Sequence, residues 1–291
     1  MIVITGATGA LGGAVTDHLL EHLPAERIAV VAREPARARR FADRGVEVRR
    51  GDYAEPGTLP SAFAGADQLL LVSSSDPAAD AVALHRAAIE GARHADVCRI
   101  LYTSHQGAAA DSPFAPARDH AATEAILADS GLAWTALRNG FYAHSLPGML
   151  GSWRETGMIT VPAEGPVSWT AREDSAEAAA KILLASTPVD GPVTITAEAA
   201  PTFEEVADIA TRVTGESIAF AVQDPQAWVE EKVAAGTPEF LARFSLGVYE
   251  AAAGGYLAGT DPALHELLGR APRSVADCFA ADRAETGAGR P

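Results

Sequence analysis

The sequence predicts an α/β protein with a doubly wound parallel sheet and a smaller α/β lobe toward its C-terminal end. Apolar strand-like runs alternate with helical patterns about six times before residue 145, a rhythm typical of Rossmann-type parallel sheets. Beyond Ser145 proline and glycine interrupt this rhythm. We therefore expect a first domain at residues 1–144 and a smaller lobe at residues 145–291, interleaved with the first domain.

Composition narrows the classes of partner. The chain has 291 residues, 48% of them apolar and 21% charged, with a formal net charge of −15. This composition is that of a globular protein, and the charge argues against nucleic acid or an anionic membrane as a partner. We interpret Cys98 and Cys278 as reduced thiols. The chain begins on a core strand and has no apolar run of about 20 residues, the length of a membrane span, so we expect a cytoplasmic protein without a signal peptide.

A glycine motif joins the first strand to the first helix. Gly6, Gly9 and Gly12 lie between the apolar run 2–4 and a helical pattern over residues 11–22. The first N–H groups of a helix lack partners, and the helix dipole adds positive potential there, so such a turn attracts anions. Glycine also lets a pyrophosphate approach the backbone closely. The flanking strand and helix favour dinucleotide binding over an ordinary glycine-rich turn.

The end of the second strand bears on the choice of dinucleotide. The strand at residues 27–32 ends at Arg33, 21 residues after Gly12, where such folds meet the adenosine ribose. An acidic residue there would favour NAD(H), whereas a guanidinium suits the 2′-phosphate of NADP(H). Three more arginines follow within seven residues, and the adjacent Glu34 is a contrary signal. We therefore favour NADP(H) over NAD(H).

Polar residues also follow the next strands. Asp52 comes after the third strand and is a candidate acceptor for the adenine amino group or a cap for the helix after Pro56. The apolar run 67–72 ends in three serines. Because ligands of open α/β sheets lie at the carboxyl ends of strands, these hydroxyls are candidates for the nicotinamide half of the cofactor, or else plain turn residues. The three are Ser73, Ser74 and Ser75.

The catalytic pair of the short-chain dehydrogenases is missing. In that pair, Tyr-x-x-x-Lys, the lysine lowers the pKa of the tyrosine, which passes a proton to the substrate oxygen. This chain has two lysines, Lys181 and Lys232, and the residues four positions before them are Glu177 and Trp228. Ketone reduction with a tyrosine proton is therefore disfavoured. Hydride transfer to an acceptor that takes its proton from water remains open, as does cofactor binding without chemistry.

The helix expected over residues 118–130 carries two other titratable side chains. His120 and Glu124 are four residues apart and therefore share one helix face. We interpret them as an exposed surface pair rather than as a proton relay to an acceptor. Two side chains are too few for a metal site, and we expect no bound metal.

Seven segments resemble one family in their order and spacing. The chain is similar to the NmrA-like atypical short-chain dehydrogenases, in particular to NADPH-dependent type 2 quinone oxidoreductases and triphenylmethane reductases. Members of this type also lack the tyrosine–lysine pair. The segments are ITGATGALGG, VAREPARA, GDYAEPGTL, LLLVSSSD, ILYTS, DHAATEAILADSGL and TALRNGFY.

The resemblance implies roles for individual residues. It implies a Rossmann domain with a smaller C-terminal lobe, and an acceptor held in the cleft between them. It also implies that Arg33 faces the 2′-phosphate. One departure is His144, where relatives often have an acidic or amide residue. The implied contacts are Gly6, Thr8, Gly9, Ala10 and Leu11 for the pyrophosphate, Ser73, Ser74, Tyr102, Thr103 and Asn139 for the nicotinamide end, and Phe141 and Tyr142 for the acceptor wall.

These observations support the hypothesis of an NADPH-dependent reductase of quinones or similar flat conjugated acceptors. Stacking the acceptor on the nicotinamide would shorten the path of the hydride. Asn139 or Tyr102 would stabilise the developing oxyanion, and His120 is a further catalytic candidate. The alternatives are a non-catalytic NADP(H) sensor that reports to a protein partner, as NmrA does, and a tailoring reductase for one natural product. A homodimer is left open.

Overall fold

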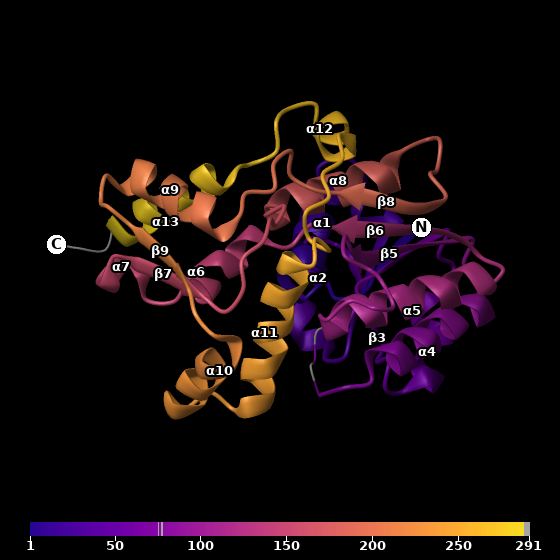
Figure 1. Cartoon of the computed structure of the whole chain (residues 1–291). Coiled ribbons are helices and arrows are strands. Elements are labelled where there is room, and N and C mark those ends of the chain that lie inside the picture. Colours follow the sequence, from indigo (N-terminus) through magenta and orange to yellow (C-terminus); the bar gives the residue numbers. More distant parts are fainter. Residues whose placement is uncertain (75, 77, 288–291) are drawn as a thin grey trace. The chain divides into compact units, whose positions relative to one another are not determined.

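The computed structural model describes residues 1–74, 76 and 78–287. Over these residues the chain forms a seven-stranded sheet with the strand order β3-β2-β1-β4-β5-β6-β8 (Figure 1). The pairs β1–β2, β1–β4, β2–β3 and β4–β5 are all parallel. This order is that of a Rossmann sheet extended by one strand, which confirms the predicted fold class. The strands of this sheet are β1 (Ile2–Ile4), β2 (Ile28–Ala32), β3 (Glu47–Arg50), β4 (Gln68–Leu71), β5 (Arg99–His105), β6 (Ala133–Asn139) and β8 (Gly191–Ile195).

Helices alternate with the strands in the first half of the chain and dominate the second half. Some of these helices begin at a side-chain cap. Asp80 accepts a hydrogen bond from the backbone N–H of Ala83 at 2.9 Å, and Thr202 and Glu205 form a capping box at the start of α9. The helices are α1 (Ala10–Leu20), α2 (Arg39–Ala42), α3 (Leu59–Phe63), α4 (Ala81–His94), α5 (Ala115–Asp129), α6 (Leu146–Met149), α7 (Trp153–Thr156), α8 (Arg172–Leu184), α9 (Phe203–Thr214), α10 (Pro225–Ala234), α11 (Glu239–Ala253), α12 (Ala263–Leu268) and α13 (Val275–Gly287), with short 3₁₀ turns at η1 (Ala25–Arg27), η2 (Pro35–Ala38), η3 (Pro56–Thr58) and η4 (Ala143–Ser145).

Two strands differ from the sequence-based expectation. The run near residue 194 was assigned to the C-terminal lobe, but β8 pairs with β6 and extends the main sheet. The apolar run RILY of residues 99–102 predicts a strand that ends at Tyr102, whereas β5 continues to His105. Thr103 and Ser104 are buried, and a threonine in a buried position fits the pleated strand as well as a turn.

The chain divides into two compact units, each assembled from three segments. The first unit comprises residues 1–105, 119–138 and 175–193, and the second comprises residues 106–118, 139–174 and 194–291. The chain therefore passes from one unit to the other several times, and no single boundary at residue 144 separates the units.

Each unit has its own apolar core. In the first unit, strand residues such as Val3, Leu69 and Ile100 pack with Phe63 and Leu127 from the helices. The buried runs IVI of β1 and IAVVA of β2 have no exposed face, as expected of strands covered on both sides.

The second unit has a more aromatic core. It contains Trp153, Trp169, Phe203 and Tyr249, all nearly free of solvent contact. A separate parallel pair of strands, β7 (Met158–Val161) and β9 (Ala219–Val222), belongs to this unit, as do α9 and α13, which pack together. Among the described residues, no helix has the length and apolar character that crossing a membrane requires.

Candidate cofactor site

The loop between β1 and α1 requires glycine at two of its three motif positions. Gly6 has a φ of +63°, and a Cβ on it would lie 2.8 Å from the Cβ of Val72. A Cβ on Gly12 would lie 2.6 Å from the carbonyl oxygen of Gly6, so α1 packs against the loop only without a side chain here. Gly9 is less constrained, since the nearest atom to its Cβ position is 3.3 Å away.

The N-terminus of α1 faces this loop without a side-chain cap. Gly9 is the N-cap, no side chain accepts from the first turn, and that turn contains no acidic residue. Thr8, Gly9 and Ala10 are exposed, Leu11 is half-buried and Gly12 is buried. Unpaired helix N–H groups and the positive end of the helix dipole therefore coincide with a surface that admits a ligand backbone. The arrangement fits the pyrophosphate of a dinucleotide.

Arg33 lies directly after β2 with its guanidinium available. It is exposed, and among the described residues it makes no hydrogen bond or ion pair. The adjacent Glu34, which argued against NADP(H) in the sequence, makes its ion pair with Arg37 and not with Arg33. The later arginines of this segment all contact carboxylates: Arg37 lies 4.0 Å from Glu34, Arg39 lies 3.7 Å from Asp43 and Arg40 lies 3.0 Å from Asp17.

Asp52 caps a turn rather than a helix. Its carboxylate accepts from the backbone N–H of Ala54 at 3.0 Å, whereas the N-cap of the following 3₁₀ turn is Glu55. The helix-capping alternative is therefore wrong, because the short Asp side chain finds a donor two residues on. A contact with adenine stays a prediction.

The sequence reasoning missed a hydrogen-bonded tie between the ends of β1 and β4. Thr5 Oγ1 donates to the carbonyl of Leu70 at 3.0 Å and accepts from the backbone N–H of Val72 at 2.8 Å. The Tyr53 hydroxyl lies 2.6 Å from Thr5 Oγ1 and 3.0 Å from the carbonyl of Val72. Burial raises the pKa of Tyr53 above its usual range. This tie holds the glycine loop against β4.

The residues after β4 are held by side chains from two other elements. Thr103 Oγ1, on β5, accepts from the backbone N–H of Ser73 at 2.8 Å and donates to Ser73 Oγ at 3.1 Å. His85 Nε2, on α4, accepts from the backbone N–H of Ser74 at 2.8 Å. Ser75 lies outside the described residues. Ser73, Ser74 and Thr103 are thus brought together as the sequence indicates, whereas His85 had no assigned role.

A buried network of histidine and tyrosine lies behind this turn. The Tyr102 hydroxyl is 2.7 Å from His120 Nδ1 and 3.4 Å from His85 Nδ1, and the rings of His105 and His120 stack with centroids 6.1 Å apart. Burial lowers the pKa of His85 and of His105 to about 4, and lowers that of His120 well below its usual value. All three rings are therefore neutral at pH 7.

The structure places Tyr102, the expected oxyanion donor, in the core of the first unit. The side chain is wholly buried, and burial raises its pKa far above the usual value. The Tyr102 hydroxyl already lies 2.7 Å from His120 Nδ1, and its role as an oxyanion donor stays a prediction. Tyr102 links the half-buried His120 to the core through the contact of its hydroxyl with His120 Nδ1.

Glu124 is not part of an exposed pair with His120. It is 7% exposed and accepts from Arg138 on β6, with Nε 3.0 Å from Oε1 and Nη2 2.5 Å from Oε2. Ser104 Oγ on β5 donates to the same carboxylate at 2.6 Å. The bond to Glu124 raises the pKa of Arg138. The surface interpretation is therefore wrong, because the helix face that carries Glu124 packs against the sheet.

Asn139 belongs to the second unit, together with the residues expected to form the acceptor wall. It is 3% exposed, and its Nδ2 donates to the Tyr142 hydroxyl at 3.2 Å. Its Oδ1 is buried and has no partner among the described residues. Tyr142 is half-buried with a pKa raised to about 12 by burial, and the Arg172 guanidinium lies 5.6 Å from its ring centroid. Arg172 also contacts His144.

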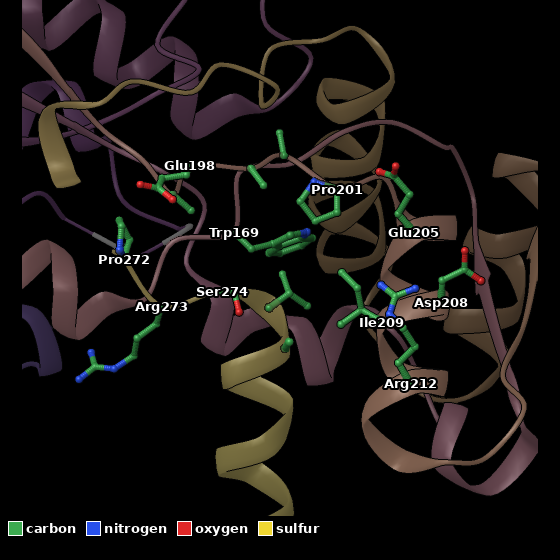
Figure 2. A pocket seen from close by; sticks show the side chains of 15 residues that line it. Trp169, Glu198, Pro201, Glu205, Asp208, Ile209, Arg212, Pro272, Arg273 and Ser274 are labelled. Atoms are coloured by element: carbon green, nitrogen blue, oxygen red, sulfur yellow. The ribbon is translucent and has the colours of Figure 1, made fainter. Parts of the chain in front are cut away.

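The second unit also has an open pocket of about 580 Å³ that the sequence did not indicate. Figure 2 shows the indole of Trp169 at its centre, with Ile209 and Arg212 of α9 on one side and Arg273 on the other. The Trp169 Nε1 is buried and has no partner among the described residues. Arg273 and Arg270 both donate to the Asp174 carboxylate at 2.9 Å. None of the predicted site residues lines this pocket.

The described part of the chain offers no cluster of three or more potential metal-ligating side chains. The chemistry of the first unit is instead that of a nucleotide site, with backbone N–H groups at a helix terminus, an exposed arginine after β2 and a polar turn after β4. Together they define a dinucleotide-binding protein of the Rossmann class.

Comparison with known proteins places the chain within this class. Residues 6–186 match a family model described as NAD(P)H-binding. The chain is 32% identical to Quinone oxidoreductase 2 of Escherichia coli over 95% of its own length and 96% of that protein, and 31% identical to an NAD(P)H azoreductase of Xenophilus azovorans over 99% and 100%. It therefore belongs to the NAD(P)H-binding, NmrA-like family.

Solved structures agree with the sequence relatives. The E. coli quinone oxidoreductase complexed with NADPH has a TM-score of 0.89 at 32% identity, covering 97% of this chain and 99% of that chain. The Citrobacter triphenylmethane reductase complexed with NADP(H) has a TM-score of 0.88 at 31% identity, with the same coverage. The family resemblance read from the sequence is confirmed.

Proposed function

We propose that the protein is an NADPH-dependent reductase of quinones or similar flat conjugated acceptors. The observation that carries this proposal is the pairing of an uncapped glycine loop with Arg33, an exposed guanidinium with no partner among the described residues. NADPH carries two anionic groups that these features can bind. The pyrophosphate suits the helix N-terminus, and the 2′-phosphate suits the guanidinium. The names of the quinone, azo and triphenylmethane reductases, each about one-third identical to this chain, support the acceptor class.

The chain's residues have distinct tasks in this proposal. The N–H groups of α1 bind the pyrophosphate, Arg33 binds the 2′-phosphate, and Ser73, Ser74 and Thr103 orient the nicotinamide half. When bound, NADPH supplies the hydride. A quinone takes up that hydride and one proton from water and becomes a hydroquinone, so no tyrosine–lysine pair is required. Orientation of the two partners is the main catalytic contribution.

Asn139 and Tyr142 are the residues we assign to the acceptor. Asn139 keeps a buried amide oxygen without a partner among the described residues, and the Tyr142 hydroxyl receives its bond from the Asn139 amide. The hydroxyl proton of Tyr142 is then available for an acceptor oxygen that gains charge, in line with electrostatic stabilisation of oxyanions. We leave Tyr102 out of this role because its hydroxyl already lies 2.7 Å from His120 Nδ1.

The proposal is tested by NADPH absorbance over time with a small soluble quinone, and with NADH in a matched reaction. We expect protein-dependent loss of NADPH and slower loss of NADH. Loss of NADH at the same rate would contradict the role of Arg33. Tight NADPH binding without any loss would favour the sensor or a tailoring reductase for one natural product over the quinone reductase.

A further inference from the structure

His85 is a buried histidine whose bonds fix where its proton resides. Its Nε2 lies 2.8 Å from the backbone N–H of Ser74. A backbone N–H can only donate, so Nε2 must present its lone pair and the ring proton must be on Nδ1. Nδ1 lies 2.9 Å from Thr123 Oγ1. The Thr123 hydroxyl donates in turn to the carbonyl of Asp119 at 2.8 Å, which leaves its oxygen free to accept from His85.

The surroundings keep this histidine in one form. The side chain is 1% exposed, and burial lowers its pKa to about 4, so Nε2 remains an acceptor at neutral pH. Tyr102 packs edge-on against the ring, with centroids 5.3 Å apart. Burying a polar ring costs free energy that an apolar side chain of similar size would not cost. The advantage of histidine at this position is therefore that it accepts the hydrogen bond from Ser74.

That bond acts at the start of the turn after β4. Thr103 holds the N–H of Ser73 and His85 holds the N–H of Ser74, from β5 and α4 respectively. Two consecutive N–H groups are thus bound by side chains, and the Ser73 and Ser74 hydroxyls are presented from a fixed backbone. The glycine loop and Arg33 do not take part in these bonds.

We propose that His85 is a positioning residue for the nicotinamide half of the cofactor. Through Nε2 it holds the Ser73–Ser74 backbone in the conformation that binds this half, and it leaves the binding of the adenosine and pyrophosphate half unchanged. This inference rests on the proposed cofactor site.

Two uncharged substitutions separate the bond from the presence of a polar side chain. His85→Gln carries an oxygen at the position of Nε2 and can accept from Ser74, whereas His85→Asn is too short to reach it. The ligands are NADPH and 2′-phospho-ADP-ribose, which lacks only the nicotinamide. Dissociation constants come from calorimetric titration of the full chain.

We expect His85→Asn to weaken NADPH binding by about 5- to 10-fold, the effect of one lost hydrogen bond, and to leave 2′-phospho-ADP-ribose binding unchanged. His85→Gln should restore most of the NADPH affinity. Equal weakening of both ligands by His85→Asn, or no weakening of either, would overturn the inference. If the wild-type protein binds 2′-phospho-ADP-ribose but not NADPH, only the nicotinamide assignment is overturned, and if it binds neither ligand, the proposed cofactor site is overturned as well.

A second measurement does not need His85→Asn to fold. In protein labelled with ¹⁵N-histidine, the resonances missing from the His85→Gln spectrum belong to His85. They must show a neutral ring with its proton on Nδ1 at pH 7. A proton on Nε2 would exclude the bond from Ser74 and overturn the inference even if His85→Asn does not fold.

Discussion

The two ends of the proposed cofactor site are positioned in different ways. At the pyrophosphate end the ligand groups are backbone N–H groups, and their position depends on the absence of side chains at Gly6 and Gly12. At the nicotinamide end the turn is held by buried side chains of Thr103 and His85. At the first end, a side chain added to Gly6 or Gly12 would clash with neighbouring atoms. The second end depends on hydrogen bonds from Thr103 and His85 and on the protonation state of His85. Substitutions and pH should therefore affect the two ends differently.

The largest effect is expected at Gly12. In Gly12→Ala the new Cβ would meet the backbone of Gly6 at 2.6 Å, and because backbone atoms cannot turn aside, the loop must shift. We expect a loss of about 3 kcal/mol in the free energy of unfolding and an NADPH dissociation constant raised by about 100-fold. Chemical denaturation and calorimetry measure the two. The matched control is Gly148→Ala, where a Cβ meets nothing within 4 Å, and equal behaviour of the two variants would refute the close-packing argument.

Arg33→Asp should give the next largest change. It places a carboxylate where the 2′-phosphate is expected, so we predict that the ratio of kcat/KM for NADPH to that for NADH falls by roughly 100-fold, corresponding to about 2.7 kcal/mol. Arg37→Asp introduces the same charge change in the same segment, but Arg37 already lies 4.0 Å from Glu34, so its effect should be much smaller. Similar ratios for both variants would mean that the general charge of the segment, and not Arg33, selects the cofactor.

The nicotinamide end should respond to pH. The folded-state pKa of His85 is about 4, below the unfolded value of about 6.5, so the unfolded chain binds more protons between these values. The free energy of unfolding therefore falls as the pH falls from 6.5 toward 4. Relative to His85→Gln, the wild type should lose about 2 kcal/mol more between pH 7 and pH 5. Parallel pH profiles from urea denaturation would show that His85 is not buried in its neutral form.

A smaller effect is expected for Glu124→Gln. The amide keeps the size of the side chain but leaves the half-buried guanidinium of Arg138 without its countercharge, at a cost of about 1 to 2 kcal/mol in the free energy of unfolding. The control is Glu239→Gln, which removes an exposed partner of Arg243 at 2.8 Å and should cost less than about 0.5 kcal/mol. If denaturation midpoints move equally, Glu124 belongs to the surface after all.

The sequence predicts the two ends with unequal success, for physical reasons. The glycine loop and Arg33 are local features, because a strand, a turn and a helix follow one another within twenty residues and each has its own compositional signal. The turn after β4 is organised by contacts distant in sequence, such as Ser74 with His85 and Ser73 with Thr103. No periodicity shows that His85 accepts a backbone N–H, or that Tyr102 faces inward.

Glu124 and β8 show the same limit. His120 and Glu124 do share a helix face, but only the packing of α5 on the sheet decides that this face is buried against Arg138. A short run near residue 194 has strand character in either unit, and its pairing with β6 is a tertiary choice. Local sequence thus predicts the type of an element better than its partner.

The most direct test of the reductase proposal is a single turnover without oxygen. The protein is mixed with an equal amount of NADPH and an excess of a soluble quinone, and NADPH oxidation and hydroquinone formation are followed together. The account predicts one hydroquinone for each NADPH oxidised, and almost none with the Gly12→Ala protein. Stoichiometric NADPH binding without hydroquinone would contradict it and would leave the two alternatives, a cofactor-binding sensor and a reductase of one natural product.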